Sequence, residues 1–449
     1  MESVSMTASW RLRVASLLGG ALLGGLMTGT AAAAGTLTVE NGQEALPSGQ
    51  EVTVYIKVAV RPPAPSDVEK RVPLNLALVL DRSGSMQGDR IANARRAANR
   101  LIEMLQPEDR VSVVTFSSDA KVLLSSAEEI NKQKAIAKIN TLKAGGSTAL
   151  FAGVSLGSEQ ILAHFDPKRV NRIVLLSDGE ANVGPQTPEE LAGLGRRLAG
   201  KGMSVTTVGL GLDYNETLMA RLAGSSDGNH VFVKTAADLE TVFQEEFMDA
   251  ATVVARDATI RVRCGTDVSP VKVYGYDGKI DNGEVTVEIP QLQGDQEKYV
   301  IIEAKVKTGT ADTQTLASVS ANYTMLADGK KISEEGVSSV RLVADAKEAE
   351  KSLNTPVMEK VIVQTATEKN DEALAAISAG DTKKGQQLLL ENRMMLEQRA
   401  RDLDSEELKA MGSVVTEYET MAAQPAQASE VKKSMQQGIY NEKKQKKFK

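Results

Sequence analysis

The chain has few of the residues on which crosslinks and many catalytic sites depend. Of its 449 residues only one is cysteine and only two are histidine. The single cysteine, Cys264, has no partner for an intrachain disulfide, so stability must come from packed cores. The single tryptophan, Trp10, lies in the first 34 residues, so a chain cleaved after them would lack tryptophan fluorescence.

Other absences argue against an enzyme or a nucleic-acid binder. The sequence has no G-x-x-x-x-G-K-S/T phosphate loop and no strand-linked G-x-G-x-x-G. His164 and His230 both precede predicted strands, which places them at the amino end of a sheet, away from the motif described below. The formal net charge is −6, which disfavours general binding to nucleic acid. We therefore expect a protein without catalytic activity and without a nucleic-acid partner.

The first 34 residues have the pattern of an export signal. Arg11 and Arg13 precede an apolar stretch, Val14 to Met27, and small residues follow from Thr30 to Ala34. This pattern predicts cleavage near residue 34 and a periplasmic or secreted mature protein. A retained membrane anchor is the alternative, although the stretch is short and rich in glycine. No later segment resembles a transmembrane helix, so we expect the mature chain to be soluble.

Two separate stretches have the alternation of half-buried β-strands. In residues 35–65, every second position from Val52 to Val60 is apolar. In residues 251–345 the same alternation returns between turn-forming pairs. Together they predict one antiparallel β-sandwich that is interrupted by the segment between them. The predicted turns are Asp277-Gly278, Asn282-Gly283 and Asp328-Gly329.

The intervening segment, residues 70–250, alternates short apolar runs with amphipathic helices. Runs such as Leu76 to Leu80 and Ile173 to Leu176 are apolar throughout, as in parallel strands covered on both faces. Residues 121–124 are expected to add a short antiparallel edge strand. The pattern predicts an α/β fold with a doubly wound, mostly parallel sheet, inserted in the sandwich.

Residues 346–423 are predicted to be helical. Thr355-Pro356 marks a helix start and Gly380-Asp381 a break. Leu389, Leu396 and Leu403 recur at heptad spacing, but three positions are too few for a coiled coil, and a helical hairpin packed on the body is favoured. The polar, lysine-rich tail, residues 424–449, is predicted to be disordered. Contact of this tail with an anionic surface is the alternative.

Three oxygen-rich segments are expected to meet. Asp81-Arg82-Ser83-Gly84-Ser85 follows the first buried strand, Gly145-Gly146-Ser147-Thr148 opens a helix, and Ser177-Asp178-Gly179 ends another strand. Loops at the carboxyl ends of strands gather at the switch point of a doubly wound sheet, so one pocket should form. Alternatively, the first segment is only the cap of the next helix.

These segments, in this order, resemble the von Willebrand factor type A family and its metal-ion-dependent adhesion site, over about residues 73–248. The resemblance implies a doubly wound fold of that family and a metal bound by five side chains. Either Ser147 or Thr148 fits the third hydroxyl position, and the register of the following helix favours Thr148. The implied metal ligands are Asp81, Ser83, Ser85, Thr148 and Asp178.

Ligands that are all oxygen suit a hard cation, so Mg²⁺ is expected, with Ca²⁺ or Mn²⁺ tolerated. The family commonly binds partners through a carboxylate that completes the metal's coordination. The order of strands, type A domain and further strands is similar to bacterial exported type A proteins and to inter-α-trypsin inhibitor heavy chains, up to about residue 345. This layout implies an exported protein.

The sequence therefore predicts metal-dependent capture of an Asp or Glu carboxylate on a partner protein, in cell adhesion or envelope assembly. One alternative is a structural scaffold that acts through its helical region, with the metal only stabilising the fold. A minor alternative is a metal-dependent hydrolase.

Overall fold

The computed structural model describes residues 36–64, 71–127 and 130–445. The predicted export signal, residues 1–34, lies outside these residues, as do Lys446, Lys447 and Lys449. Within the described ranges, no helix is both long and apolar enough to cross a membrane.

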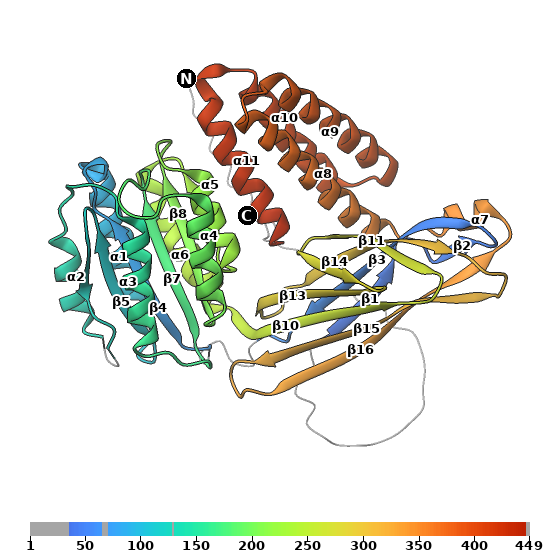
Figure 1. The fold of residues 1–449 in the computed structure, drawn as a ribbon, viewed down its shortest axis with the longest axis horizontal. Coiled ribbons are helices and arrows are strands. Elements are labelled where there is room, and N and C mark those ends of the chain that lie inside the picture. The colour runs from blue at the N-terminus through green and yellow to red at the C-terminus, as the bar shows by residue number, and fades with distance from the viewer. Residues whose placement is uncertain (1–35, 65–70, 128–129, 446–449) are drawn as a thin grey trace, which may run out of the picture. The chain divides into compact units, whose positions relative to one another are not determined.

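Two sheets form the sandwich (Figure 1). One sheet has the strand order β1-β3-β14-β11 and the other β12-β13-β10-β15-β16-β2. All neighbours are antiparallel except β16 and β2. The strands are β1 (Thr36–Asn41), β2 (Ala45–Pro47), β3 (Glu51–Arg61), β10 (Val253–Cys264), β11 (Val268–Tyr274), β12 (Gly278–Asp281), β13 (Glu284–Gln293), β14 (Lys298–Lys307), β15 (Thr313–Met325) and β16 (Lys331–Val343).

The two predicted stretches do close one sandwich. Strand β3 pairs with β14 in continuous register from Val60 opposite Lys298 to Glu51 opposite Lys307. Every second residue of β3, including Ile56 and Val58, points inward and packs in a core shared by both sheets. The α/β segment is therefore an insertion within the sandwich, as the sequence predicted.

The inserted segment contains a six-stranded sheet with the order β6-β5-β4-β7-β8-β9. Only β6 is antiparallel to its neighbour. The elements are β4 (Leu74–Asp81), α1 (Asp89–Met104), β5 (Arg110–Phe116), β6 (Ala120–Leu124), α2 (Lys132–Asn140), α3 (Leu150–Leu162), β7 (Val170–Ser177), α4 (Pro188–Ala199), β8 (Met203–Leu210), α5 (Glu216–Ser225), β9 (His230–Val233) and α6 (Leu239–Ala251).

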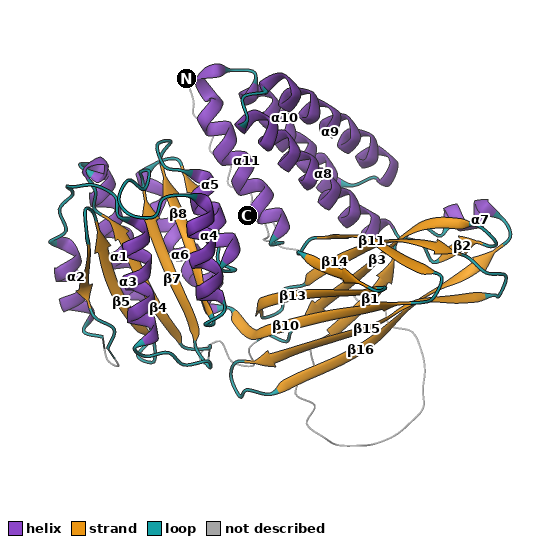
Figure 2. Cartoon of the chain, viewed as in Figure 1, coloured by secondary structure: helices purple, strands orange, loops and turns teal. Residues whose placement is uncertain are grey.

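Helices cover both faces of this sheet (Figure 2). Successive residues of β4 point to opposite faces, so Leu78 packs in the core formed with α1, α2 and α6, whereas Val79 packs in the core formed with α3, α4 and α5. This two-sided burial explains why the central strands are apolar at every position. The predicted doubly wound α/β fold is confirmed.

The chain enters the α/β domain at the amino end of β4 and leaves it through α6, directly into β10. Near this junction Arg172 of β7 is almost fully buried. It donates hydrogen bonds to Asp249 of α6 (2.8 Å) and to Gln291 of β13 (2.9 Å). The sandwich is thus fastened to the amino end of the parallel strands, and the loops at their carboxyl ends lie at the other end of the sheet.

The C-terminal helices are α7 (Ala346–Lys351), α8 (Thr355–Ser378), α9 (Thr382–Leu403), α10 (Glu406–Ala422) and α11 (Ala428–Lys443). The last four share one core, in which Leu389 and Leu396 are buried. The heptad leucines therefore belong to a helical bundle, which is larger than the predicted hairpin. Val361 of α8 belongs to one buried apolar cluster with Ala59 of β3, so α8 covers this part of the sandwich.

The prediction of a disordered tail over residues 424–449 is wrong for residues 428–443, which form α11. Val431, Met435 and Ile439 recur every four residues and are buried, so one face of this polar segment contributes to the bundle core. Lys443 and Lys444 form ion pairs with Asp371 and Asp227. The overall polarity of the segment concealed its apolar stripe.

Candidate metal centre

Main-chain hydrogen bonds join the three oxygen-rich segments into one loop cluster at the carboxyl ends of β4 and β7. The Gly84 N–H donates to the Gly146 carbonyl (2.9 Å), and the Gly145 N–H donates to the Arg82 carbonyl (2.7 Å). Gly146 has a φ of +93°, and a Cβ there would lie 2.9 Å from Ser118 Oγ. This turn therefore needs glycine.

The third segment joins the cluster through Asn182. Its N–H donates to the Thr148 carbonyl (3.1 Å), and its side-chain oxygen accepts from the Thr148 N–H (2.8 Å). These two bonds hold the residues that follow β7 against the start of α3. Two segments that are 34 positions apart in the chain are thereby fixed next to each other.

Asp81 is the innermost residue of the cluster and is fully buried. Its Oδ1 accepts from the Ser83 N–H (2.7 Å), and its Oδ2 accepts from Ser177 Oγ (2.5 Å). Burial raises the pKa of Asp81 to about 6, although the hydrogen bonds from Ser177 and Ser83 partly oppose this rise. Ionising a buried carboxyl group costs free energy when its only partners are neutral hydrogen-bond donors. A cation bound nearby would reduce that cost.

The hydroxyl groups connect Asp81 with the second carboxylate. Ser83 Oγ and Ser85 Oγ are 3.0 Å apart, and Ser85 Oγ donates to Asp178 Oδ1 (2.7 Å). The Ser85 and Thr148 hydroxyl oxygens both face Gly179, at 3.5 and 3.7 Å from the position that its Cβ would occupy. The structure thus brings together all five residues that the sequence proposed, with Thr148 rather than Ser147 facing inward.

This set of groups fits a hard divalent cation. It offers three neutral hydroxyls and two buried carboxylates, and all potential donors are oxygen. In the described part of the chain no three His, Cys, Asp or Glu side chains form a metal-binding group. A softer transition metal that prefers nitrogen or sulfur would therefore find no matching ligands in this cluster.

Ser177 and Arg90 also contact the carboxylates of the cluster, and neither was proposed as a site residue from the sequence. Ser177 donates to Asp81, and Arg90 donates from Nη1 to Asp178 Oδ2 (2.6 Å). Arg90 Nη2 also reaches Asp213 Oδ2 (3.3 Å), in the loop after β8. Hydrogen bonding to Asp178 raises the pKa of Arg90, so its charge is retained. Arg90 lies in the first turn of α1, shortly after the turn that contains Ser85. This closeness in the sequence could have indicated that its side chain reaches the same loop cluster.

The hydrogen bonds of Ser83 and Ser85 in the described structure include no histidine. His230, the first residue of β9, is fully buried and has its Nδ1 2.9 Å from Thr207 Oγ1. Burial and, second, Lys433 lower the pKa of His230 to about 3. Burial raises the pKa of the Cys264 thiol to about 11, which makes it a poor nucleophile. The cluster therefore offers no activated nucleophile of the Ser–His kind.

The sequence of the central domain is similar to several known proteins. Residues 75–245 match the von Willebrand factor type A domain. The uncharacterised protein YfbK of Escherichia coli is 30% identical over 204 residues, which are 45% of this chain and 35% of YfbK. Human inter-alpha-trypsin inhibitor heavy chain H3 is 31% identical over 179 residues, 38% of this chain and 20% of H3. The chain thus spans well under half of both relatives.

A longer match is the uncharacterised protein sll0103 of Synechocystis, 28% identical over 305 residues, which are 66% of this chain and 71% of that protein. Among solved structures, a von Willebrand factor type A protein from Catenulispora acidiphila has a TM-score of 0.66 at 18% identity, over 90% of this chain and 96% of its own. The ArnB paralog VWA2 from Sulfolobus acidocaldarius has a TM-score of 0.60 at 19% identity, over 92% and 99%. At these identities the two structures establish the fold alone.

Proposed function

Because residues 75–245 of this chain are a von Willebrand factor type A domain, we propose that the domain binds one divalent cation, and that this cation captures a carboxylate of a partner protein. Domains of this family generally serve protein interaction or adhesion. The proposal concerns adhesion or assembly in the bacterial envelope rather than catalysis.

The observation that carries the proposal is the convergence of Asp81, Ser85, Thr148 and Asp178 in one loop cluster. A turn that only capped the next helix would not explain it. Ser83 does not cap the short helical turn that follows, and its hydroxyl instead lies beside that of Ser85. Two buried carboxylates together with three hydroxyls have the composition of a cation site rather than of a helix cap.

In the proposed site Ser83, Ser85 and Thr148 supply hydroxyl ligands, and Asp81 and Asp178 bind the ion directly or through water. Mg²⁺ is the proposed ion, with Ca²⁺ or Mn²⁺ as substitutes. When bound, the cation supplies a Lewis-acidic position for a carboxylate of the partner. The protein's own contribution is to hold these oxygens in place, with Ser85 exposed at the surface end of the cluster.

We further propose that the protein is exported, with cleavage near residue 34. The support is the sequence of residues 1–34, which has the composition of a signal peptide. N-terminal sequencing of the protein recovered from the periplasm or medium tests this directly. A mature chain that still begins at Met1 would contradict it.

Metal binding is tested on the mature chain after removal of metal with EDTA. Addition of Mg²⁺ should raise the melting temperature of the wild type and leave Asp178→Ala and Ser85→Ala unchanged. Ser413→Ala is the matched control, since Ser413 is exposed on α10 and should respond like the wild type. A wild type that shows no thermal response to Mg²⁺, Ca²⁺ or Mn²⁺ would overturn the proposal.

Partner capture is tested by comparing proteins that bind in Mg²⁺ with those that bind in EDTA. A true partner binds the wild type only in Mg²⁺, fails to bind Ser85→Ala, and loses binding when its own Asp or Glu is replaced by the amide. Capture that persists in both EDTA and Ser85→Ala would instead support a scaffold that acts through the helical region. Deleting residues 346–449 is a poor test, because α8 covers the sandwich and α11 contacts the α/β domain.

A further inference from the structure

Helix α11, which belongs to the C-terminal bundle, also contacts β9 and α5 of the α/β domain. Figure 1 shows α11 beside α5. The edge strand is β9, and its Phe232 N–H donates to Gln437 Oε1 (2.9 Å). Lys234, the residue after β9, pairs with Glu430 (2.6 Å). A side chain of α11 thus accepts a hydrogen bond from a main-chain N–H of the edge strand.

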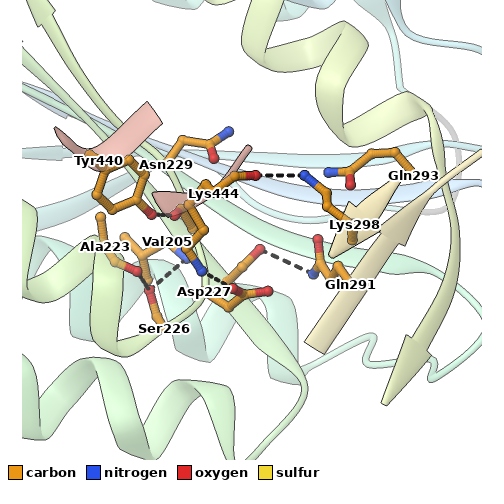
Figure 3. A network of polar contacts seen from close by, with 12 residues as sticks. Val205, Ala223, Ser226, Asp227, Asn229, Gln291, Gln293, Lys298, Tyr440 and Lys444 are labelled. Atoms are coloured by element: carbon orange, nitrogen blue, oxygen red, sulfur yellow. Dashed lines mark hydrogen bonds and ion pairs between the residues drawn. The ribbon is translucent and has the colours of Figure 1, made fainter. Parts of the chain in front are cut away.

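The C-terminal end of α11 is anchored away from the metal centre. Tyr440 Oη contacts the Gly228 carbonyl, and Lys444 forms an ion pair with Asp227, both just before β9 (Figure 3). Lys298 of the sandwich donates to the Lys444 carbonyl (2.7 Å). This end therefore has contacts of its own with both the α/β domain and the sandwich, separate from those of the N-terminal half.

The N-terminal half of α11 holds the loop that follows β8, residues 211–215. Ser429 Oγ donates to the Leu212 carbonyl (3.1 Å). Lys433 Nζ donates to the Tyr214 carbonyl (2.8 Å) and to Glu216 Oε2 (2.7 Å), and it lies 4.3 Å from the centre of the Tyr214 ring. Lys433 is only 1% exposed. A lysine buried to this degree persists only where its charge is paired, so these contacts define one arrangement of the loop.

Asp213 lies in the same loop, between the two residues that α11 contacts. Its carboxylate accepts from Arg90 Nη2 (3.3 Å), while Nη1 of the same guanidinium bonds the metal-site carboxylate Asp178 (2.6 Å). The guanidinium of Arg90 is therefore shared between the proposed metal ligand Asp178 and a loop that α11 contacts. The connection runs from Lys433 through the loop and Arg90 to Asp178.

We propose that α11 sets the metal affinity of the centre through residues 211–215 and Arg90. The positive charge of Arg90 on Asp178 opposes a second cation, and Asp213 draws part of that charge away. When Lys433 holds the loop, Asp213 stays in reach of Arg90 and the centre binds metal more tightly. When the N-terminal half of α11 is released, Arg90 pairs with Asp178 alone and the affinity falls.

The coupling is reciprocal by thermodynamic necessity, so metal binding in turn strengthens the docking of α11. A carboxylate partner that requires the metal would then also favour the docked helix. The bundle and the metal centre would respond to each other, although α11 lies outside residues 75–245. This inference rests on the proposed function, because it needs a cation at the centre.

The test is calorimetric titration of Mg²⁺ into the full mature chain. Lys433→Met, which keeps the apolar stem, and Asp213→Asn should each weaken Mg²⁺ binding about fivefold or more. Arg90→Gln should strengthen it, and Lys433→Met should have no further effect in the Arg90→Gln background. Lys432→Met is the matched control on the same helix and should bind like the wild type.

The comparison in the Arg90→Gln background separates coupling from a general loss of stability. A fold that Lys433→Met had merely loosened would bind Mg²⁺ more weakly whether or not Arg90 is present. Asp213→Asn guards against a folding defect of Lys433→Met, since the Asp213 side chain is 71% exposed. A second readout is hydrogen exchange of residues 428–437, which should slow on addition of Mg²⁺ in the wild type and not in Arg90→Gln.

If the wild type binds Mg²⁺ and both Lys433→Met and Asp213→Asn bind it equally well, the coupling is refuted and the proposed function stands. If the wild type binds no divalent ion, both fall together.

Discussion

Replacing Asp81 with asparagine should stabilise the metal-free protein and abolish its stabilisation by metal. The carboxylate is fully buried, and its pKa rises from 3.8 to about 6. That rise corresponds to about 3 kcal/mol by which the folded state opposes the ionised form near neutral pH. Asparagine removes this cost, keeps an oxygen for the Ser83 N–H, and presents an amide to Ser177, whose hydroxyl can accept.

The pH dependence follows from the direction of this shift. A raised folded-state pKa means that the cost is fully present above about pH 6, and that it disappears as the pH falls toward 3.8, where the unfolded chain is also protonated. The advantage of Asp81→Asn over the metal-free wild type should therefore be largest at neutral pH and vanish near pH 4. This behaviour separates it from a simple packing effect, which would not vary with pH.

Metal should reverse the order of the two proteins. At a concentration about 1,000 times its Kd, Mg²⁺ adds about 4.1 kcal/mol to the free energy of unfolding of the wild type and nothing to the variant. This gain exceeds the advantage of about 3 kcal/mol that the variant has without metal. The assay is urea unfolding followed by far-UV circular dichroism, in EDTA and in Mg²⁺, at pH 7.5 and pH 4.5. Asp81→Asn that is less stable than the wild type in EDTA at pH 7.5, or that gains as much from Mg²⁺, would refute the reasoning.

Three other predictions test the fold of the α/β domain away from the metal centre. His230 has a folded-state pKa of about 3, so as the pH falls the unfolded chain takes up a proton at this residue first. The free energy of unfolding should therefore fall by up to about 1.4 kcal/mol per pH unit below about pH 6.5. Urea unfolding of the wild type and of His230→Phe measures this, and the same pH dependence in both proteins would contradict it. Gly195→Ala should cost about 1–3 kcal/mol, because its Cβ would lie 2.7 Å from a main-chain carbonyl of α5, whereas Gly193→Ala on the same helix has room and should gain up to about 1 kcal/mol in thermal unfolding. Arg172→Leu should cost about 3–5 kcal/mol by leaving the Asp249 carboxylate without its buried cation, and a loss below about 1 kcal/mol would show that the junction tolerates the change.

Much of the fold and of the candidate site could be predicted from local pattern. Runs such as Leu76 to Leu80 are apolar at each position because two helical layers cover the sheet, and this signature can be recognised without a structure. The alternation in residues 52–60 and the turn pairs similarly indicated the sandwich. Four of the five oxygen side chains lie in short motifs at the carboxyl ends of β4 and β7, and loops at that end of a parallel sheet gather together. The fifth, Thr148, lies in the motif that opens α3.

The tertiary structure alone decided which charged and polar residues join these parts. A lysine in a polar stretch has the same appearance in sequence whether it is solvated or buried, so Lys433 and the helix that carries it were read as part of a disordered tail. The pairing of Arg90 with both Asp178 and Asp213 is likewise a contact between residues about 90 and 120 positions apart. Local periodicity reports which face of an element is apolar, whereas the partner of a buried charge is set by the three-dimensional arrangement of distant segments.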